Sequence, residues 1–309
     1  MPERSSPSAP SPSSAAETLG DAPRSTGGFV ESVPASGPAL RESFDGDAAP
    51  ISLSKEIAAE VPSPPPARDT GSTKDFIADI LARGPDSAAY RKHGVGTTVH
   101  ESTHDINRIL RRKHGGVGTG LYFGEGRSAW FEEPSVTKAQ AAAFIPEDAR
   151  RMAHRYREYI VSSEHADHIW NLMDEWSAYV NEARAVVETA PSGEWRNGEP
   201  NVVSTDIVDG SADFLMFCGA ALAAIRKSDP GYFERAPESK AIFRDLAERT
   251  ARYVSAGVAF TEPDGNRPFG RHHAAAMMTT LAKDPQAAPI RAAFTSLFGA
   301  AWTSSVLGF

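Results

Sequence analysis

Hydrophobic residues recur at helical spacing through most of the chain from about residue 74 onward. Phe76, Ile77 and Ile80 open the pattern, and apolar positions three and four apart are typical of a helix that buries one face. Thr137 with Gln140 has the form of a capping box that starts a helix. The same periodicity predicts helices over 165–189, 210–227, 237–256, 270–282 and 287–299.

One stretch breaks the helical pattern. Residues 121–123 and 127–132 are rich in aromatic and apolar residues, and a Gly-Glu-Gly sequence separates them. Two short strands around a glycine turn form a β-hairpin, and we expect this hairpin to border a cleft. The predicted fold class is therefore mainly α (α+β), with a small β-hairpin and a C-terminal helical portion.

Residues 1–73 differ in composition from the remainder, because they are rich in Ser, Pro, Ala and Gly and poor in aromatic clusters. Such a segment buries too little apolar surface to offset the entropy lost on ordering. We predict a disordered leader over 1–73 and a single domain over 74–309. The leader is either a plain tail or a signal for a non-classical secretion machinery.

Charge and composition exclude some classes of protein. The 309 residues carry a formal net charge of -8, which argues against nucleic-acid binding. The single cysteine, Cys218, lies in an apolar run and is expected to be a buried thiol. No apolar stretch is long enough for a membrane span, and the N-terminus has no hydrophobic segment of the Sec type. We expect a cytoplasmic protein or one exported by a non-Sec route, as secreted effectors are.

The sequence V-H-E-S-T-H-D-I-N-R-I-L-R-R, residues 99–112, carries the strongest chemical signal. His100 and His104 stand four apart, so on a helix both imidazoles project from one face. Val99, Ile106 and Leu110 form the neighbouring apolar stripe, which we expect to be buried. Two nitrogen ligands at this spacing suit a single Zn²⁺, and Glu101 between them is placed to take a proton from water. Thr97 or Thr98 is expected to cap the start of this helix, and Gly115 with Gly116 to end it.

Two histidines alone hold zinc weakly, so we expect a third protein ligand. Glu175 is the first candidate, because it flanks the apolar stripe of the helix predicted over 165–189 and shares its edge with Tyr179 and Glu182. Glu125 is the alternative, 21 positions after His104 (125 minus 104), but a glycine on each side of it favours a turn. Three further histidines are less favoured as ligands: His154, His165 and His168.

These two segments together resemble a known family. The H-E-x-x-H helix followed by a glutamate on a second helix is similar to the zincin metallopeptidases in their gluzincin arrangement. More narrowly, H-E-S-T-H-D-I-N followed by D-E-W-S-A-Y resembles a little-characterised bacterial group with H-E-x-T-H-x-I-N and D-E-W-x-A-Y motifs. The resemblance covers about residues 97–188 and implies a zincin-like core, zinc and peptide hydrolysis.

On this interpretation His100, His104 and Glu175 are the metal ligands, and Glu101 is the general base. Tyr179 is the candidate that stabilises the oxyanion, with Tyr122 on the hairpin as the second choice. Orienting contacts to the ligands are expected from Asp105, Asn107 and Arg111. The hairpin is expected to bind a protein or peptide substrate by adding a strand.

Two other functions stay open on the sequence. The same metal chemistry would serve a zinc amidohydrolase whose substrate is not a peptide, because loops decide substrate choice. A zincin-fold binding or structural protein is the second alternative, although the intact Glu101 argues against it. His272 and His273 point about 100° apart on a helix and are expected on a helix surface.

Overall fold

Helices make up most of the computed structural model of the chain, which describes residues 73–84, 94–116, 118–124, 127–153, 155–162, 168–193, 205–260 and 273–309. One two-stranded antiparallel sheet is the only sheet among these residues, and the prediction of a mainly α chain with a small hairpin is confirmed. Residues 1–72 of the predicted leader lie outside the described residues, so its disorder and the domain boundary stay predictions.

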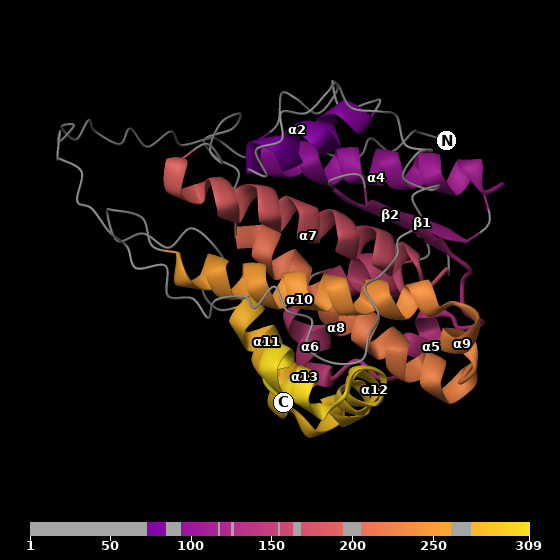
Figure 1. Cartoon of the computed structure of the whole chain (residues 1–309). Helices are drawn as coiled ribbons and strands as arrows, with labels where there is room; N and C mark the ends of the chain where they lie inside the picture. The colour runs from indigo at the N-terminus through magenta and orange to yellow at the C-terminus, as the bar shows by residue number, and fades with distance from the viewer. Residues whose placement is uncertain are drawn as a thin grey trace, which may run out of the picture. The chain divides into compact units, whose positions relative to one another are not determined.

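Figure 1 shows how the elements are arranged. In chain order the described elements are α2 (Thr73–Arg83), α4 (Val95–Lys113), β1 (Thr119–Gly124), β2 (Arg127–Phe131), α5 (Lys138–Ala142), α6 (Glu147–Met152), the π-helical turn η1 (Tyr156–Val161), α7 (Asn171–Thr189), the 3₁₀ turn η2 (Ala190–Ser192), α8 (Thr205–Ser228), α9 (Tyr232–Arg235), α10 (Pro237–Ala259), α11 (His273–Lys283), the 3₁₀ turn η4 (Pro285–Ala287), α12 (Ala288–Phe298) and α13 (Ala300–Leu307).

Helix α4 carries the H-E-x-x-H sequence and begins earlier than expected. Its N-cap is Gly94, and the Thr98 hydroxyl donates to the Gly94 carbonyl at 3.0 Å from inside the first turn. The predicted cap at Thr97 or Thr98 is wrong because a threonine hydroxyl can bond back to the i−4 carbonyl within a helix. The predicted end is confirmed, since Gly115 and Gly116 have positive φ and the Gly116 N–H donates to the Arg111 carbonyl at 2.9 Å.

Helices α4 and α7 lie side by side and antiparallel in Figure 1. Their direction follows from the contacts, because His100 meets Glu182 while His104, further along α4, meets Asp174, earlier in α7. The apolar stripe of α4 is fully buried, as the periodicity predicted: Val99, Ile106 and Leu110 are 0% exposed. The polar edge of α4 therefore faces α7, where the site forms.

Strand β1 packs on α4 and pairs with β2 in antiparallel register, with Tyr122 opposite Ser128. A Cβ at Gly120 would stand 2.5 Å from the Leu110 Cβ, so only glycine allows β1 this close to the helix. The backbone groups of Tyr122 point away from β2 and are already bonded. The N–H donates to Asn107 Oδ1 at 2.7 Å, and the carbonyl accepts from Asn181 at 3.1 Å. A substrate strand therefore cannot pair with β1 at Tyr122, contrary to the prediction for this part of the hairpin.

Helix α8 is the central helix of the second half of the chain and packs against α5, α7, α10, α11 and α12. Among the described helices it alone, over Val208–Ser228, is long and apolar enough by length and composition to cross a membrane, contrary to the expectation from the sequence, and 94% of its 18-residue apolar window is buried inside the protein. Its contacts with five other helices account for the apolar sequence. Cys218 is buried there as a free thiol, as expected.

Several helix boundaries differ from those that the hydrophobic periodicity predicted. Helix α7 begins at Asn171 rather than at 165, and α13 follows α12 after Gly299, whose φ of 86° breaks the helix. The π-helical turn η1 was not expected. The Thr137 capping box is confirmed by both of its hydrogen bonds.

Candidate metal centre

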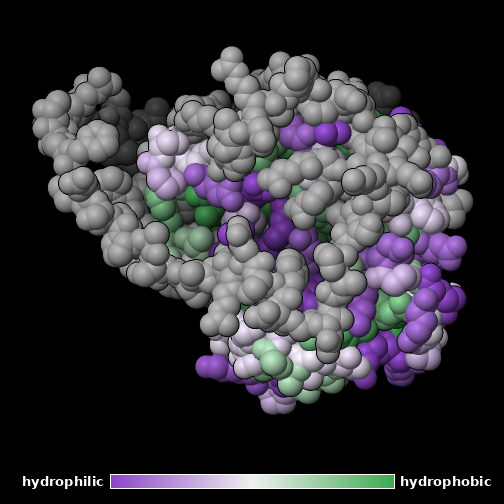
Figure 2. Space-filling model, viewed as in Figure 1, coloured by the Kyte–Doolittle hydropathy of each residue, from purple (hydrophilic) through white to green (hydrophobic). Residues whose placement is uncertain are grey.

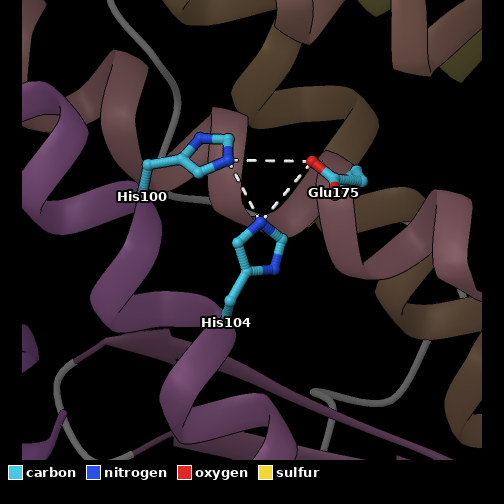
Figure 3. A group of neighbouring side chains, drawn as sticks. All are labelled: His100, His104 and Glu175. Carbon is cyan, nitrogen blue, oxygen red and sulfur yellow. Dashed lines mark hydrogen bonds and ion pairs between the residues drawn. The ribbon is translucent and has the colours of Figure 1, made fainter. Parts of the chain in front are cut away.

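Two helices bring His100, His104 and Glu175 together. The histidines project from α4 and the carboxylate from α7, and all three point toward one another in Figure 3. Each residue offers one ligand atom, and these atoms lie within 4.8 Å of one another. The structure thus assembles the predicted donor set from two segments about 70 positions apart (175 minus 104).

The distances between the donor atoms fit a single zinc ion. Tetrahedral Zn²⁺ with bonds of about 2.0–2.1 Å requires ligand atoms about 3.3 Å apart. The two Nε2 atoms of His100 and His104 are 3.1 Å apart. The Glu175 Oε2 atom lies 3.7 Å from Nε2 of His100 and 3.5 Å from Nε2 of His104.

Carboxylates on α7 fix the orientation of both imidazoles. His100 Nδ1 lies 2.9 Å from Glu182 Oε2, and His104 Nδ1 lies 2.9 Å from Asp174 Oδ2. A carboxylate beside Nδ1 keeps the imidazole proton on Nδ1 and leaves the lone pair of Nε2 for a metal ion. Metal-binding histidines usually have such a carboxylate on their other ring nitrogen. Asn107 continues the arrangement by donating to Asp174 Oδ1 at 2.5 Å.

One oxygen of the Glu175 carboxylate is buried without a hydrogen bond. This Oε2 atom is inaccessible to solvent and has no hydrogen-bond partner among the described residues. Leaving a buried carboxylate oxygen without a donor is costly. A cation between Oε2 and the two Nε2 atoms would remove this cost, so the residues present fit a metal ion.

The charges of the site are strongly coupled. Burial lowers the pKa of His100, but the charge of Glu182 and contacts with Glu175 and Glu182 outweigh burial and raise the pKa to about 9. Burial raises the pKa of Glu175, but its contacts with His100 and His104 outweigh burial and lower the pKa to about 2. Without a metal, the acidic surroundings therefore favour a protonated His100, and a bound cation would take the place of that positive charge.

A cavity of about 410 Å³ opens beside this cluster. Glu101, His104 and Glu175 line it, together with Thr119 and Gly120 of the hairpin. The expectation that the hairpin borders a cleft is confirmed for β1. Figure 2 shows hydrophilic residues toward the centre of this face of the molecule. Glu101 thus shares the cavity with two of the three predicted ligands, which is where a general base must lie.

Tyr179 lies against the cluster. Its ring meets the His100 ring edge-on, with centroids 4.5 Å apart, and its hydroxyl accepts a hydrogen bond from Arg155 Nε at 3.0 Å. Arg155 is 1% exposed and donates to Asp213 at 3.2 Å. Asp213 in turn lies 2.6 Å from His273 Nε2. His273 is therefore half-buried in a polar network rather than on an open helix surface, and its neighbour His272 lies outside the described residues.

The other sequence candidates lie elsewhere. The Tyr122 hydroxyl donates to Asp79, and the residue is 0% exposed, so this tyrosine is not the oxyanion stabiliser. Asp105 pairs with Arg108, and Arg111 donates to the Gly116 carbonyl at 3.2 Å, so Asn107 alone of the three expected orienting residues is placed as predicted. His168 pairs with Glu133 at 2.9 Å. Glu125, His154 and His165 lie outside the described residues.

Sequence reasoning missed the residues that act across helices. Glu182 stands seven positions after Glu175 on the same edge of α7, so that spacing alone could have indicated it, whereas Asp174 directly precedes Glu175 and points about 100° away from it. Arg155 had no such signal, because its contact with Tyr179 depends on how η1 packs. Tyr159, also on η1, lies near enough to Glu175 for that charge to raise its pKa, after burial as the larger cause.

Comparisons with other proteins add nothing to the resemblance to zincins that the sequence motifs show. No protein-family model, no curated protein and no solved structure matches this chain. The class of the protein therefore has to be argued from the site itself.

Proposed function

We propose that this chain is a zinc-dependent hydrolase that cleaves peptide bonds, with a zincin-like core. The observation that carries the proposal is the convergence of three donor atoms at separations of 3.1, 3.5 and 3.7 Å, close to the edges of a zinc tetrahedron. The absence of a hydrogen bond to the buried Oε2 atom of Glu175 also supports it.

His100, His104 and Glu175 would hold the ion, with Glu182 and Asp174 fixing the two imidazoles. Zn²⁺ bound there would lower the pKa of a water molecule and draw electron density from a substrate carbonyl. This ligand set leaves a fourth position for substrate or water, as catalytic sites require and structural sites do not.

The remaining steps belong to side chains of this chain. Glu101 accepts a proton from the attacking water at its carboxylate and passes it to the leaving amine. The Tyr179 oxygen accepts from Arg155, and its own proton would donate to the oxygen that gains charge in the transition state. Its ring lies against His100 and is not part of the cavity lining. The cavity beside Glu101 receives the substrate chain.

The Glu101→Gln variant tests this function. It keeps every ligand, so we expect it to bind zinc as the wild type does, while its hydrolysis of casein or a mixed peptide pool falls by about 10²–10⁴-fold. Glu238→Gln on the exposed start of α10 is the matched control. Full activity in Glu101→Gln would exclude the proposed base. A zinc-loaded wild type that cleaves no peptide, but does cleave a simple ester or amide, would favour the non-peptide hydrolase.

A further inference from the structure

The cavity extends from the metal centre along one stripe of α4. Glu101, His104, Arg108 and Arg111 all line it, and these positions follow one another at steps of three or four on a single helix face. Arg111 stands seven positions after His104 (111 minus 104), or about 10 Å along the helix axis at a rise of about 1.5 Å per residue. An extended peptide covers that distance in about three residues.

Most of the charges in this cavity are already paired. Asp174 accepts from Asn107 and meets His104, and Asp105 pairs with Arg108 at 2.5 Å. Glu175 belongs to the metal centre, where bound Zn²⁺ would neutralise it. Apart from Glu101, the proposed general base, the acidic groups near His104 are therefore engaged with protein groups or with the ion.

Arg111 differs from these groups. Its Nε donates to the Gly116 carbonyl, which positions the guanidinium, while Nη2 makes a long ion pair with Glu133. The Oε1 atom of Glu133 lies 3.9 Å from Nη2, and the other oxygen of Glu133 already meets His168. The Arg111 side chain is 39% exposed, so a group in the cavity can reach it.

We propose that Arg111 is a specificity-determining residue that binds a carboxylate of the peptide substrate about three residues from the bond cleaved. A guanidinium fork matches a carboxylate in a bidentate geometry. The chain as a whole is acidic, with a net charge of -8, so attraction for such a substrate comes from this local cation and not from the overall field. The inference rests on the proposed hydrolase function and names the substrate class of the same site.

Both an acidic side chain and a C-terminal carboxylate offer this chemistry. The test uses four mixtures of nonapeptides made of Ala, Gly, Ser, Leu and Phe with one fixed central residue. Three mixtures have blocked ends and carry Glu, Gln or Lys at the centre. The fourth carries Gln and a free C-terminal carboxylate. Products of the zinc-loaded enzyme are sequenced by mass spectrometry, and initial rates are compared.

We expect wild-type rates about tenfold higher on the Glu mixture than on the blocked Gln mixture if the carboxylate is a side chain, with Lys lowest. A tenfold advantage for the free-acid mixture would assign the carboxylate to the C-terminus. In Arg111→Gln the ratio of rates that defines either preference should fall to about one. In Arg111→Glu the Lys mixture should be cleaved fastest. Arg112→Gln is the matched control, because Arg112 is exposed on α4 and outside the cavity lining.

A second readout does not depend on turnover. Fluorescence anisotropy of labelled versions of the same mixtures on zinc-loaded Glu101→Gln should show the same order of affinity, and Glu101→Gln with Arg111→Gln should lose it. Equal wild-type rates on Glu and Gln mixtures with no free-acid advantage, or a preference that survives Arg111→Gln, would overturn the proposal while leaving the hydrolase intact. Failure of the wild type to cleave any mixture, with no carboxylate preference in binding, would overturn both.

Discussion

Carboxylates hold His100 and His104 at their Nδ1 atoms, whereas the Nε2 atoms of the two rings point toward each other. Glu182 and Asp174 each lie 2.9 Å from an Nδ1 atom, so the orientation of both rings is set before any ion arrives. Preorganisation of this kind lowers the cost of binding, because the ligands need not be ordered at that moment.

Removing either orienting charge should weaken the site without removing a ligand. We expect Glu182→Gln and Asp174→Asn each to lower zinc affinity by about tenfold or more. Competition with a chromophoric chelator measures the change, and Glu238→Gln serves as the control. Unchanged affinity in both variants would mean that the two carboxylates only satisfy buried histidines.

At the scale of elements, close packing between helices positions the site. A Cβ at Gly210 of α8 would stand 2.3 Å from Cδ1 of Tyr179, so α8 approaches the tyrosine more closely than any other residue would permit. The same ring stacks on Phe214, with centroids 5.4 Å apart. Tyr179 is thus clamped between α8 and the His100 ring.

Gly210→Ala tests this clamp because two effects oppose each other. Alanine favours a helix over glycine by about 1 kcal/mol, but overpacking against a fixed ring costs about 1–3 kcal/mol. We expect a net loss in the free energy of unfolding, measured by urea denaturation, and a loss of peptidase activity with zinc still bound. A more stable variant with full activity would show that Tyr179 is not held in place.

The sequence indicated the elements that depend on local periodicity. The apolar stripe of α4, its glycine stop and the hairpin followed from spacings within about 20 residues. Glu175 was found because it flanks the apolar stripe of its own helix. Asp174 with His104, and Arg155 with Tyr179, were missed because their pairing depends on how separate helices pack, which no local pattern records. The start of α4 was misplaced because Thr98 bonds within the helix instead of capping it.

At the scale of the whole molecule, a buried polar network ties the C-terminal helices to the site. His273 at the start of α11 meets Asp213 of α8, and Asp213 meets Arg155, which holds Tyr179. The hydrogen bond that His273 donates to the Asp213 carboxylate raises the pKa of this histidine, and burial opposes this rise to a smaller extent. The protonated imidazolium is therefore the form that the folded protein stabilises.

This network predicts a pH dependence of stability. A histidine whose pKa is higher in the folded than in the unfolded chain stabilises the folded state. Its contribution to the free energy of unfolding is complete below the unfolded pKa of about 6.5. The contribution disappears as pH rises through the folded value. We expect the midpoint of thermal unfolding of the wild type to exceed that of His273→Gln at pH 6, and the difference to shrink by pH 9. His168→Gln, an exposed histidine, should keep the wild-type dependence, and a constant difference for His273→Gln would contradict the account.

Elemental analysis of the purified chain tests whether His100, His104 and Glu175 hold a zinc ion. The measurement compares the wild type, Glu175→Gln and the control Glu238→Gln after reconstitution with zinc and removal of the excess. We predict about one zinc per chain in the wild type and the control, and a large loss in Glu175→Gln. A wild type without stoichiometric zinc would contradict the metal centre, and full zinc content in Glu175→Gln would exclude Glu175 as the third ligand.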